Sequence, residues 1–282
     1  MKCIKTIKQL RAQIMHWRLA RESIAFVPTM GNLHEGHLQL VRAAKGQADK
    51  VVVSIFVNPA QFDEQDDFSN YPRTQEADIA KLQSVGIDMI FLPSPEQIYP
   101  EKMLTTVSVS QVTENYCGAA RPGHFDGVAT VVCKLFNMVQ PDKAFFGEKD
   151  YQQLLVIRTM VADLNSPVEI ISVPTFREVD GLAMSSRNTH LSQEQRQQAG
   201  QLYQALCQAK QALFSQYNSY AEIEETCRQK LLGQGFKPDY FSICRRSDLQ
   251  TATEKDTHLI ILTAARLGTT RLIDNIQVDL SC

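Results

Sequence analysis

The sequence predicts an α/β protein, in which a Rossmann-like parallel sheet with helices on both faces precedes a smaller α+β domain. Short apolar, β-branched segments alternate with amphipathic ones over the first part of the chain, which is typical of parallel strands buried on both faces. Beyond Val168–Val173 the pattern changes to polar helices followed by paired strands. The 282 residues suit two domains of ordinary size. We therefore expect a Rossmann-like domain over 1–176 and a smaller C-terminal α+β domain over 177–282.

The predicted parallel sheet is built from five short apolar segments, each long enough for one buried strand. These segments are Ile24–Thr29, Val51–Val57, Met89–Leu92, Ala144–Phe146 and Val168–Val173. Helical spacing of apolar residues between them marks Leu38–Ala48, Thr74–Val85, Val128–Val139 and Tyr151–Leu164. Ligands of such sheets bind beyond the carboxyl ends of the strands, so residues just after each strand are the first candidates for a site.

The predicted second domain begins with two helical segments, Ser192–Tyr220 and Ala221–Leu232. Three strands of a small antiparallel sheet should follow at Tyr240–Cys244, His258–Thr263 and Thr270–Asn275.

Composition points to a cytoplasmic enzyme. The net charge of −2 and the pI of about 6.3 provide no general attraction for nucleic acid or an anionic membrane. No apolar run approaches the roughly 20 residues of a membrane span, and charged residues interrupt the N-terminal segment where a signal peptide would be apolar. The seven cysteines are irregularly spaced without a C-x-x-C pair, so we expect reduced side chains packed as small apolar groups.

The strongest motif is PTMGNLHEGH at 28–37, where a strand leads through a glycine turn into a helix. The start of a helix offers free N–H groups and a positive dipole end to a phosphate. His34 and His37 are three residues apart, so both imidazoles can face one ligand. The segment is neither a Walker A loop, nor G-x-G-x-x-G, nor H-E-x-x-H. The alternative interpretation is a pair of surface histidines at a helix start.

Three other segments carry polar groups beside predicted strands. Residues 184–188 (MSSRN) place two hydroxyls and a guanidinium on one loop, which suits a triphosphate, or form an ordinary interdomain loop. Residues 145–153 (FFGEKDYQQ) place Lys149 where a cation can meet phosphate, and Asp150 where a carboxylate can bind ribose or cap a helix. Residues 56–62 (FVNPAQF) place an amide that can orient a hydroxyl-bearing ligand, or form a simple turn.

The first motif resembles the HxGH signature of the nucleotidyltransferase superfamily, and the MSSR loop resembles the phosphate-covering loop of that superfamily. Taken together, the motifs are similar to those of the pantothenate synthetase family over nearly the whole chain. The segments that carry the resemblance are PTMGNLHEGH, SIFVNPAQF, YPRT, ARPGHFDGVATVV, KLFNMVQPDKAFFGEKDYQQL, DGLAMSSRN and TTRLIDN.

The resemblance implies the ATP-dependent condensation of pantoate with β-alanine through pantoyl-adenylate, with release of AMP and pyrophosphate. It implies catalytic roles for His34, His37, Lys149 and Arg187. The implied ATP contacts are Met30, Gly31, Asn32, Leu33, His34, Glu35, Gly36, His37, Gly147, Glu148, Lys149, Asp150, Phe176, Met184, Ser185, Ser186 and Arg187. The implied pantoate contacts are Gln61, Gln153 and Met30, and Gln61 also lies near β-alanine.

The resemblance further implies a homodimer and Mg²⁺ bound with ATP, with Asp78 as the candidate protein ligand of the metal. Many relatives carry an adjacent acidic pair where this chain has Ala77 and Asp78. Two alternatives stay open from sequence: another HxGH-type adenylyltransferase acting on a different small substrate, and an RNA-binding synthetase-like module, which the near-neutral charge disfavours.

Overall fold

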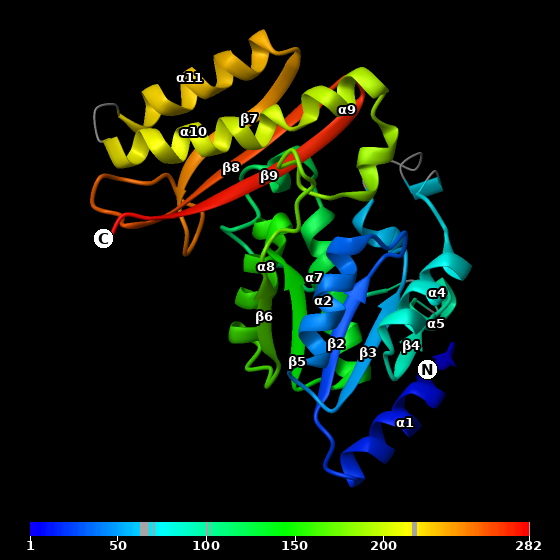
Figure 1. The fold of residues 1–282 in the computed structure, drawn as a ribbon. Helices are drawn as coiled ribbons and strands as arrows, with labels where there is room; N and C mark the ends of the chain where they lie inside the picture. Colours follow the sequence, from blue (N-terminus) through cyan, green and yellow to red (C-terminus); the bar gives the residue numbers. More distant parts are fainter. Residues whose placement is uncertain (63–67, 70, 100, 102, 216–218, 282) are drawn as a thin grey trace. The chain divides into compact units, whose positions relative to one another are not determined.

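The computed structural model describes residues 1–62, 68–69, 71–99, 101, 103–215 and 219–281. Contacts between Cα atoms divide the chain into two compact units (Figure 1). Unit 1 comprises Met1–Glu148 and Gln153–Pro174, and unit 2 comprises Lys149–Gln152 and Thr175–Cys282. The domain boundary expected at 176/177 stays a prediction.

Unit 1 is built on a parallel sheet of six strands, which confirms the predicted fold class (Figure 1). The strands lie in the order β1-β4-β3-β2-β5-β6. Their bounds are β1 Lys2–Ile4, β2 Ile24–Thr29, β3 Lys50–Ile55, β4 Met89–Phe91, β5 Lys143–Gly147 and β6 Glu169–Val173. The prediction missed β1, whose three residues are too few to show a pattern. It also placed the end of β3 two residues too late.

Helices follow the strands of unit 1 as the alternation predicts. The longer ones are α1 Ile7–Leu19, α2 Glu35–Lys45, α4 Gln75–Val85, α7 His124–Val139 and α8 Tyr151–Asp163. Short ones are η1 Pro59–Gln61, α5 Pro95–Ile98, α6 Cys117–Ala120 and η2 Glu148–Asp150. The junction of η2 and α8, Lys149–Gln152, belongs to unit 2. Both α2 and α7 begin earlier than expected, because polar residues and glycines in their first turns break the apolar spacing.

Alternate residues of the strands bury the two faces of the sheet. Val27, Val53 and Phe145 lie in one apolar cluster with residues of α2 and α4, including Val41 and Leu82. On the other face, Phe26 and Phe146 each make an edge-to-face contact with the Phe136 ring of α7 at 6.4 Å. A strand with both faces buried reads as an unbroken apolar run, and this is the reason the sequence showed β2 and β3 clearly.

The carboxyl ends of β2 and β5 mark the point where the strand order changes direction. From β2 the chain continues to β3 and β4 on one side, whereas β5 and β6 pair on the other side. Ala25 and Phe26 of β2 pair directly with Lys143 and Ala144 of β5. Open parallel sheets bind their ligands in the crevice at such a switch point. The loop after β2 and the turn after β5 are therefore the candidate site of unit 1.

Unit 2 packs helices against a small antiparallel sheet, as predicted. The helices are α9 Gln193–Ala199, α10 Gln201–Ser215 and α11 Tyr220–Gly233, and η3 Ser186–His190 precedes them. The strands β7 Phe236–Arg245, β8 His258–Leu267 and β9 Thr270–Asp279 lie in sequence order. The predicted helix Ser192–Tyr220 is divided at Gly200, and its residues 216–218 lie outside the described residues.

Within the described residues, six cysteines are free thiols, and no helix is long and apolar enough to cross a membrane. Cys227 and Cys244 are buried as expected, but Cys3 is exposed. The interpretation of every cysteine as a small core residue was therefore too broad, and Cys282 lies outside the described residues.

Candidate active site

The loop after β2 is held in a tight conformation that only certain residues can adopt. Gly31 and Asn32 both have positive φ, at 83° and 50°. The positive φ favours glycine at position 31, and a Cβ there would also fit tightly, 3.0 Å from Ile55 Cγ2 and 3.1 Å from Asp78 Oδ2. The Thr29 hydroxyl donates to the carbonyl of Ser54 at 2.8 Å and accepts from the N–H of Gly31 at 3.3 Å.

Asp78 of α4 fixes this loop through its carboxylate. Its Oδ1 accepts from the N–H of Leu33 at 2.8 Å, and its Oδ2 accepts from the N–H of Asn32 at 2.9 Å and the hydroxyl of Thr74 at 3.1 Å. The residue is fully buried, and Lys81 on the same helix donates to the carbonyl of Leu33 at 2.5 Å. Because the N–H groups of Asn32 and Leu33 are used by Asp78, other atoms of these two residues must make their expected ATP contacts.

The two histidines of the motif lie together where α2 begins. His34 is the N-cap residue, and the ring centroids of His34 and His37 are 4.0 Å apart. The N–H of His34 donates to Nδ1 of His37 at 3.3 Å. An accepting Nδ1 carries no proton, so the proton of this imidazole is on Nε2. His37 therefore presents an N–H donor beside the first turn of α2, where the helix dipole already favours an anion.

Gln61 sits in η1 after β3 and is 8% exposed. Its Oε1 accepts from Nδ2 of Asn58 at 3.0 Å, and its Nε2 approaches the Sδ atom of Met30 at 3.1 Å. The hydroxyl of Tyr99, whose pKa is raised to about 12 by burial, donates to Oδ1 of Asn58 at 2.7 Å. This chain of bonds fixes the orientation of both amides and points the Gln61 donor at Met30.

The backbone of Gln61 is held by the segment that begins α7. Nδ1 of His124 donates to the Gln61 carbonyl at 2.7 Å, and Arg121 Nη2 donates to the same oxygen at 3.3 Å. Gly127 permits α7 to approach η1, because a Cβ there would lie 2.2 Å from the carbonyl oxygen of Ala60. The sequence assigns no individual function to Asn58, Tyr99 or His124, although Asn58 lies in FVNPAQF and His124 in ARPGHFDGVATVV.

The remaining unit 1 candidates lie at the end of β5 and the start of α8. Gly147 ends β5, Glu148 begins η2, and Gln153 is the third residue of α8, where it is half-buried. Unit 1 thus brings Met30 beside Gln61 and His34 beside His37, and it places Gly147 on the strand next to β2.

Unit 2 carries the other candidates on two segments. Lys149 has a side chain 17% exposed, with Nζ 3.8 Å from Oδ2 of Asp150. The expected phosphate loop comprises η3 and the two residues before it: Ser185 is the N-cap, and its hydroxyl accepts from the N–H of Arg187 at 3.3 Å. The N–H of Met184 donates to the carbonyl of Phe176 at 3.0 Å, which closes a hairpin over 176–184. The Ser185 hydroxyl proton is left to donate to an incoming oxygen.

Fold and site together define an α/β nucleotide-binding enzyme, with a histidine-bearing helix start at the switch point of a parallel sheet. Residues 2–277 match the family model described as pantoate-beta-alanine ligase. The chain is 54% identical to a pantothenate synthetase of Acinetobacter baumannii and 52% identical to one of Idiomarina loihiensis. Each alignment covers 99% of this chain and 98% of the relative. The chain belongs to the pantoate–β-alanine ligase family and is a ligase.

Solved structures agree with this assignment. A crystal structure of pantothenate synthetase from Thermus thermophilus matches with a TM-score of 0.92 and 46% identity, over 98% of this chain and 99% of that one. The enzyme from Francisella tularensis, solved in complex with β,γ-ATP and β-alanine, matches with a TM-score of 0.83 and 35% identity, over 98% and 97%.

Proposed function

We propose that this ligase joins pantoate to β-alanine in two steps through an enzyme-bound acyl-adenylate. A carboxylate oxygen of pantoate attacks the α-phosphorus of ATP, and the bond to the bridging oxygen breaks to release pyrophosphate. The β-alanine amine then attacks the acyl carbon, AMP leaves with the carboxylate oxygen, and the nitrogen loses a proton. The single observation that carries this proposal is the loop after β2, where His34 and His37 flank the start of α2 at the switch point.

For the first step, we propose that preorganised donors stabilise the charge that develops on the phosphates. Nε2–H of His37 is one such donor, since His37 Nδ1 already accepts from the backbone. The remaining N–H groups at the start of α2 (residues 35 and 36) supply others. Lys149 and Arg187 add positive charge, and Ser185 and Ser186 add hydroxyl donors. Gly147, Glu148, Asp150, Phe176 and Met184 complete the proposed ATP contacts.

For pantoate, we propose contacts from Gln61, Gln153 and Met30, with Gln61 also near β-alanine. The Oε1 atom of Gln61 is engaged by Asn58, so the amide has a fixed donor, Nε2, to offer to a hydroxyl or carboxylate oxygen of the substrate. The Met30 sulfur is a weak partner that a substrate oxygen can replace.

The Mg²⁺ expected with ATP does not fit Asp78. Its two oxygens accept three hydrogen bonds inside a fully buried setting, and a metal there would displace the bonds that hold the loop. Among the described residues, no group of three His, Cys, Asp or Glu side chains is arranged to hold a metal. We propose that Mg²⁺ enters with ATP on its phosphate oxygens, with Asp78 shaping the loop instead.

We further propose a cytoplasmic homodimer, in accordance with the family resemblance. Light scattering at micromolar concentration tests the dimer directly, and a monomer across that range contradicts it without affecting the chemistry.

Pyrophosphate exchange into ATP tests the proposed reaction. With pantoate present and β-alanine omitted, labelled pyrophosphate should enter ATP, because adenylation is reversible. Omission of pantoate should abolish the exchange. Exchange that is independent of pantoate, or the formation of ADP, would contradict the proposal. Replacement of pantoate by its 2-deoxy analogue should lower the exchange by up to ~10⁴-fold if hydrogen bonds select the acid, and by only about 10- to 200-fold if shape alone does.

A further inference from the structure

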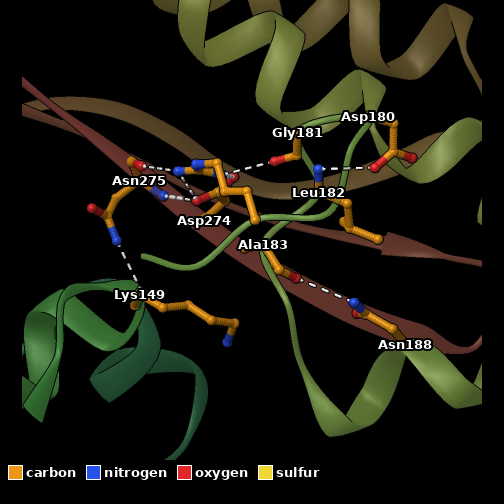
Figure 2. A network of polar contacts seen from close by, with 9 residues as sticks. Lys149, Asp180, Gly181, Leu182, Ala183, Asn188, Asp274 and Asn275 are labelled. Atoms are coloured by element: carbon orange, nitrogen blue, oxygen red, sulfur yellow. Dashed lines mark hydrogen bonds and ion pairs between the residues drawn. The ribbon is translucent and has the colours of Figure 1, made fainter. Parts of the chain in front are cut away.

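A buried polar network in unit 2 connects the two segments that carry its candidate ATP contacts (Figure 2). Its centre is Asp274 of β9, which is 3% exposed. Arg177 donates to both oxygens of Asp274, at 2.6 and 3.0 Å, and the N–H of Asn275 donates to Oδ1 at 2.7 Å. Burial raises the pKa of Asp274, and the bonds from Arg177 and Asn275 oppose this by stabilising the carboxylate. Burial of an ion pair such as Arg177–Asp274 costs free energy of desolvation, so a role other than stabilisation of the fold is expected for it.

One end of the network holds the hairpin that leads to the phosphate loop. Arg177 donates to the carbonyl of Gly181 at 3.0 Å and lies 3.8 Å above the ring of Tyr203. Further along the hairpin, Nδ2 of Asn188 donates to the carbonyl of Ala183 at 3.2 Å. The guanidinium therefore anchors the hairpin immediately before the Met184–Arg187 segment.

The other end holds Lys149. Nδ2 of Asn275 donates to the backbone carbonyl of Lys149 at 2.9 Å, and Asn275 is itself 5% exposed (Figure 2). The carbonyl of Asn275 accepts from Nη2 of Arg177 at 3.1 Å, so the backbone of Asn275 is held by the same guanidinium. Lys149 belongs to the short helix η2, and the bond to its carbonyl restrains the backbone from which its side chain extends.

We infer that Asn275 is a positioning residue for adenylation, which aims the ammonium of Lys149 at the phosphates of ATP, with Asp274 and Arg177 holding Asn275 in place. This inference rests on the proposed function, because it requires Lys149 to act on ATP. Catalytic groups lose most of their effect when displaced by about 1 Å, so one lost bond to the backbone of Lys149 is enough to slow the reaction by about 10- to 100-fold. The sequence links the TTRLIDN segment only to the family resemblance, and this inference gives its residues Asp274 and Asn275 a role in positioning Lys149.

A double-mutant cycle between Asn275 and Lys149 tests the inference in the full chain. Asn275→Ala should lower the maximal rate of pantoate-dependent pyrophosphate exchange by at least about tenfold, while the KM for pantoate stays within about threefold. In the Lys149→Ala variant, the additional change Asn275→Ala should lower the exchange rate little further. If the two losses multiply, Asn275 does not act through Lys149, and the inference is overturned.

Matched variants separate positioning from folding. Lys210→Met removes a comparable bond to β9, in which Lys210 Nζ donates to the carbonyl of Gln277 at 3.2 Å, and should leave exchange unchanged. Asn275→Asp keeps the size but turns an acceptor toward the carbonyl of Lys149, so it should match the loss of Asn275→Ala. The β-alanine step, measured on preformed pantoyl-adenylate, should keep its rate in both variants, whereas a misfolded fraction would lower both steps equally. Normal exchange by Asn275→Ala would overturn the inference, whereas an inactive parent protein would instead refute the proposed function.

Discussion

At the scale of single residues, the site depends on side chains whose hydrogen bonds fix which atom faces the ligand. His37 accepts at Nδ1 and so offers Nε2–H, and Gln61 accepts at Oε1 and so offers Nε2. In both residues one polar atom accepts a hydrogen bond that orients the ring or the amide, and we propose that the other polar atom binds the ligand. A rotated ring or amide would place the wrong atom there, so these orientations matter as much as the residue types.

Removal of one charge-stabilising donor should slow the reaction strongly. We expect His37→Ala and Lys149→Ala each to lower turnover by at least ~10²-fold, the usual scale for one preorganised donor. Steady-state AMP release measures this, with thermal unfolding to verify the fold and Lys8→Ala, an exposed lysine of α1, as the control. Near-normal turnover in either variant would remove that residue from the catalytic set.

Tyr99 should affect pantoate binding although two hydrogen bonds separate it from Gln61, the proposed pantoate contact. Tyr99→Phe removes the 2.7 Å donor to Oδ1 of Asn58 and weakens the hold on the Asn58 amide, which then keeps only the 3.3 Å bond from the N–H of Ala60 on that oxygen. One lost hydrogen bond of about 1.4 kcal/mol corresponds to about a tenfold loss in kcat/KM for pantoate. The KM for ATP should stay unchanged, and equal effects on both substrates would contradict the chain of bonds from Tyr99 to Gln61.

At the scale of helices and strands, the close approach of α7 to η1 holds Gln61 in place. A Cβ at Gly127 would meet the backbone of Ala60, which cannot rotate away as a side chain does. We expect Gly127→Ala to destabilise the protein by ~1–3 kcal/mol, as overpacking does, and to raise the KM for pantoate. Gly233→Ala in α11 is the matched control, because nothing lies within 4 Å of its Cβ position. Equal unfolding midpoints for the two variants would refute the contact.

Helix α11 carries two glutamates with opposite pH effects. Burial raises the pKa of Glu224, whose Oε1 accepts from the N–H of Ile243, whereas hydrogen bonds from Ser219 lower the pKa of Glu222. Between its ordinary value near 4.5 and its raised value in the fold, Glu224 binds more protons folded than unfolded, so its contribution to stability falls as pH rises. Glu222 contributes stability above its ordinary value and loses it as pH falls.

The free energy of unfolding in urea, measured at pH values below and above 4.5, tests the direction of both pKa shifts. Glu224→Gln should gain stability relative to the parent as pH rises above about 4.5, whereas Glu222→Gln should lose stability relative to the parent as pH rises toward about 4.5 from below. Parallel pH profiles for the parent and Glu224→Gln would show that burial does not perturb this carboxyl.

Sequence patterns predicted the elements that are apolar on both faces and missed those defined by tertiary contact. The bounds of β2 were found without error because all six residues fit a buried strand, whereas β1 has three residues, of which one is buried. The same division holds at the site. The histidines of 34–37 show in the sequence, but the bond from His124 to Gln61 joins segments 63 positions apart and leaves no local signal. The role of Asp78 was obscured for the same reason, because its partners lie on another loop.

At the scale of the whole molecule, both units carry residues that we propose for one reaction, and each organises its own set. Unit 1 holds the histidines and Gln61 at the switch point of its sheet, and unit 2 holds Lys149 and the segment before η3 through Asp274 and Asn275. Family membership extends over residues 2–277, so both units belong to the ligase.

The fate of the carboxylate oxygen of pantoate tests the central claim most directly. With pantoate labelled by ¹⁸O in its carboxylate, attack on the α-phosphorus transfers one labelled oxygen to the phosphate, and aminolysis leaves it there. Mass spectrometry of the products after complete reaction with ATP and β-alanine should therefore find AMP that carries one ¹⁸O atom, together with unlabelled pyrophosphate. AMP without label, or label in inorganic phosphate beside ADP, would contradict the acyl-adenylate route.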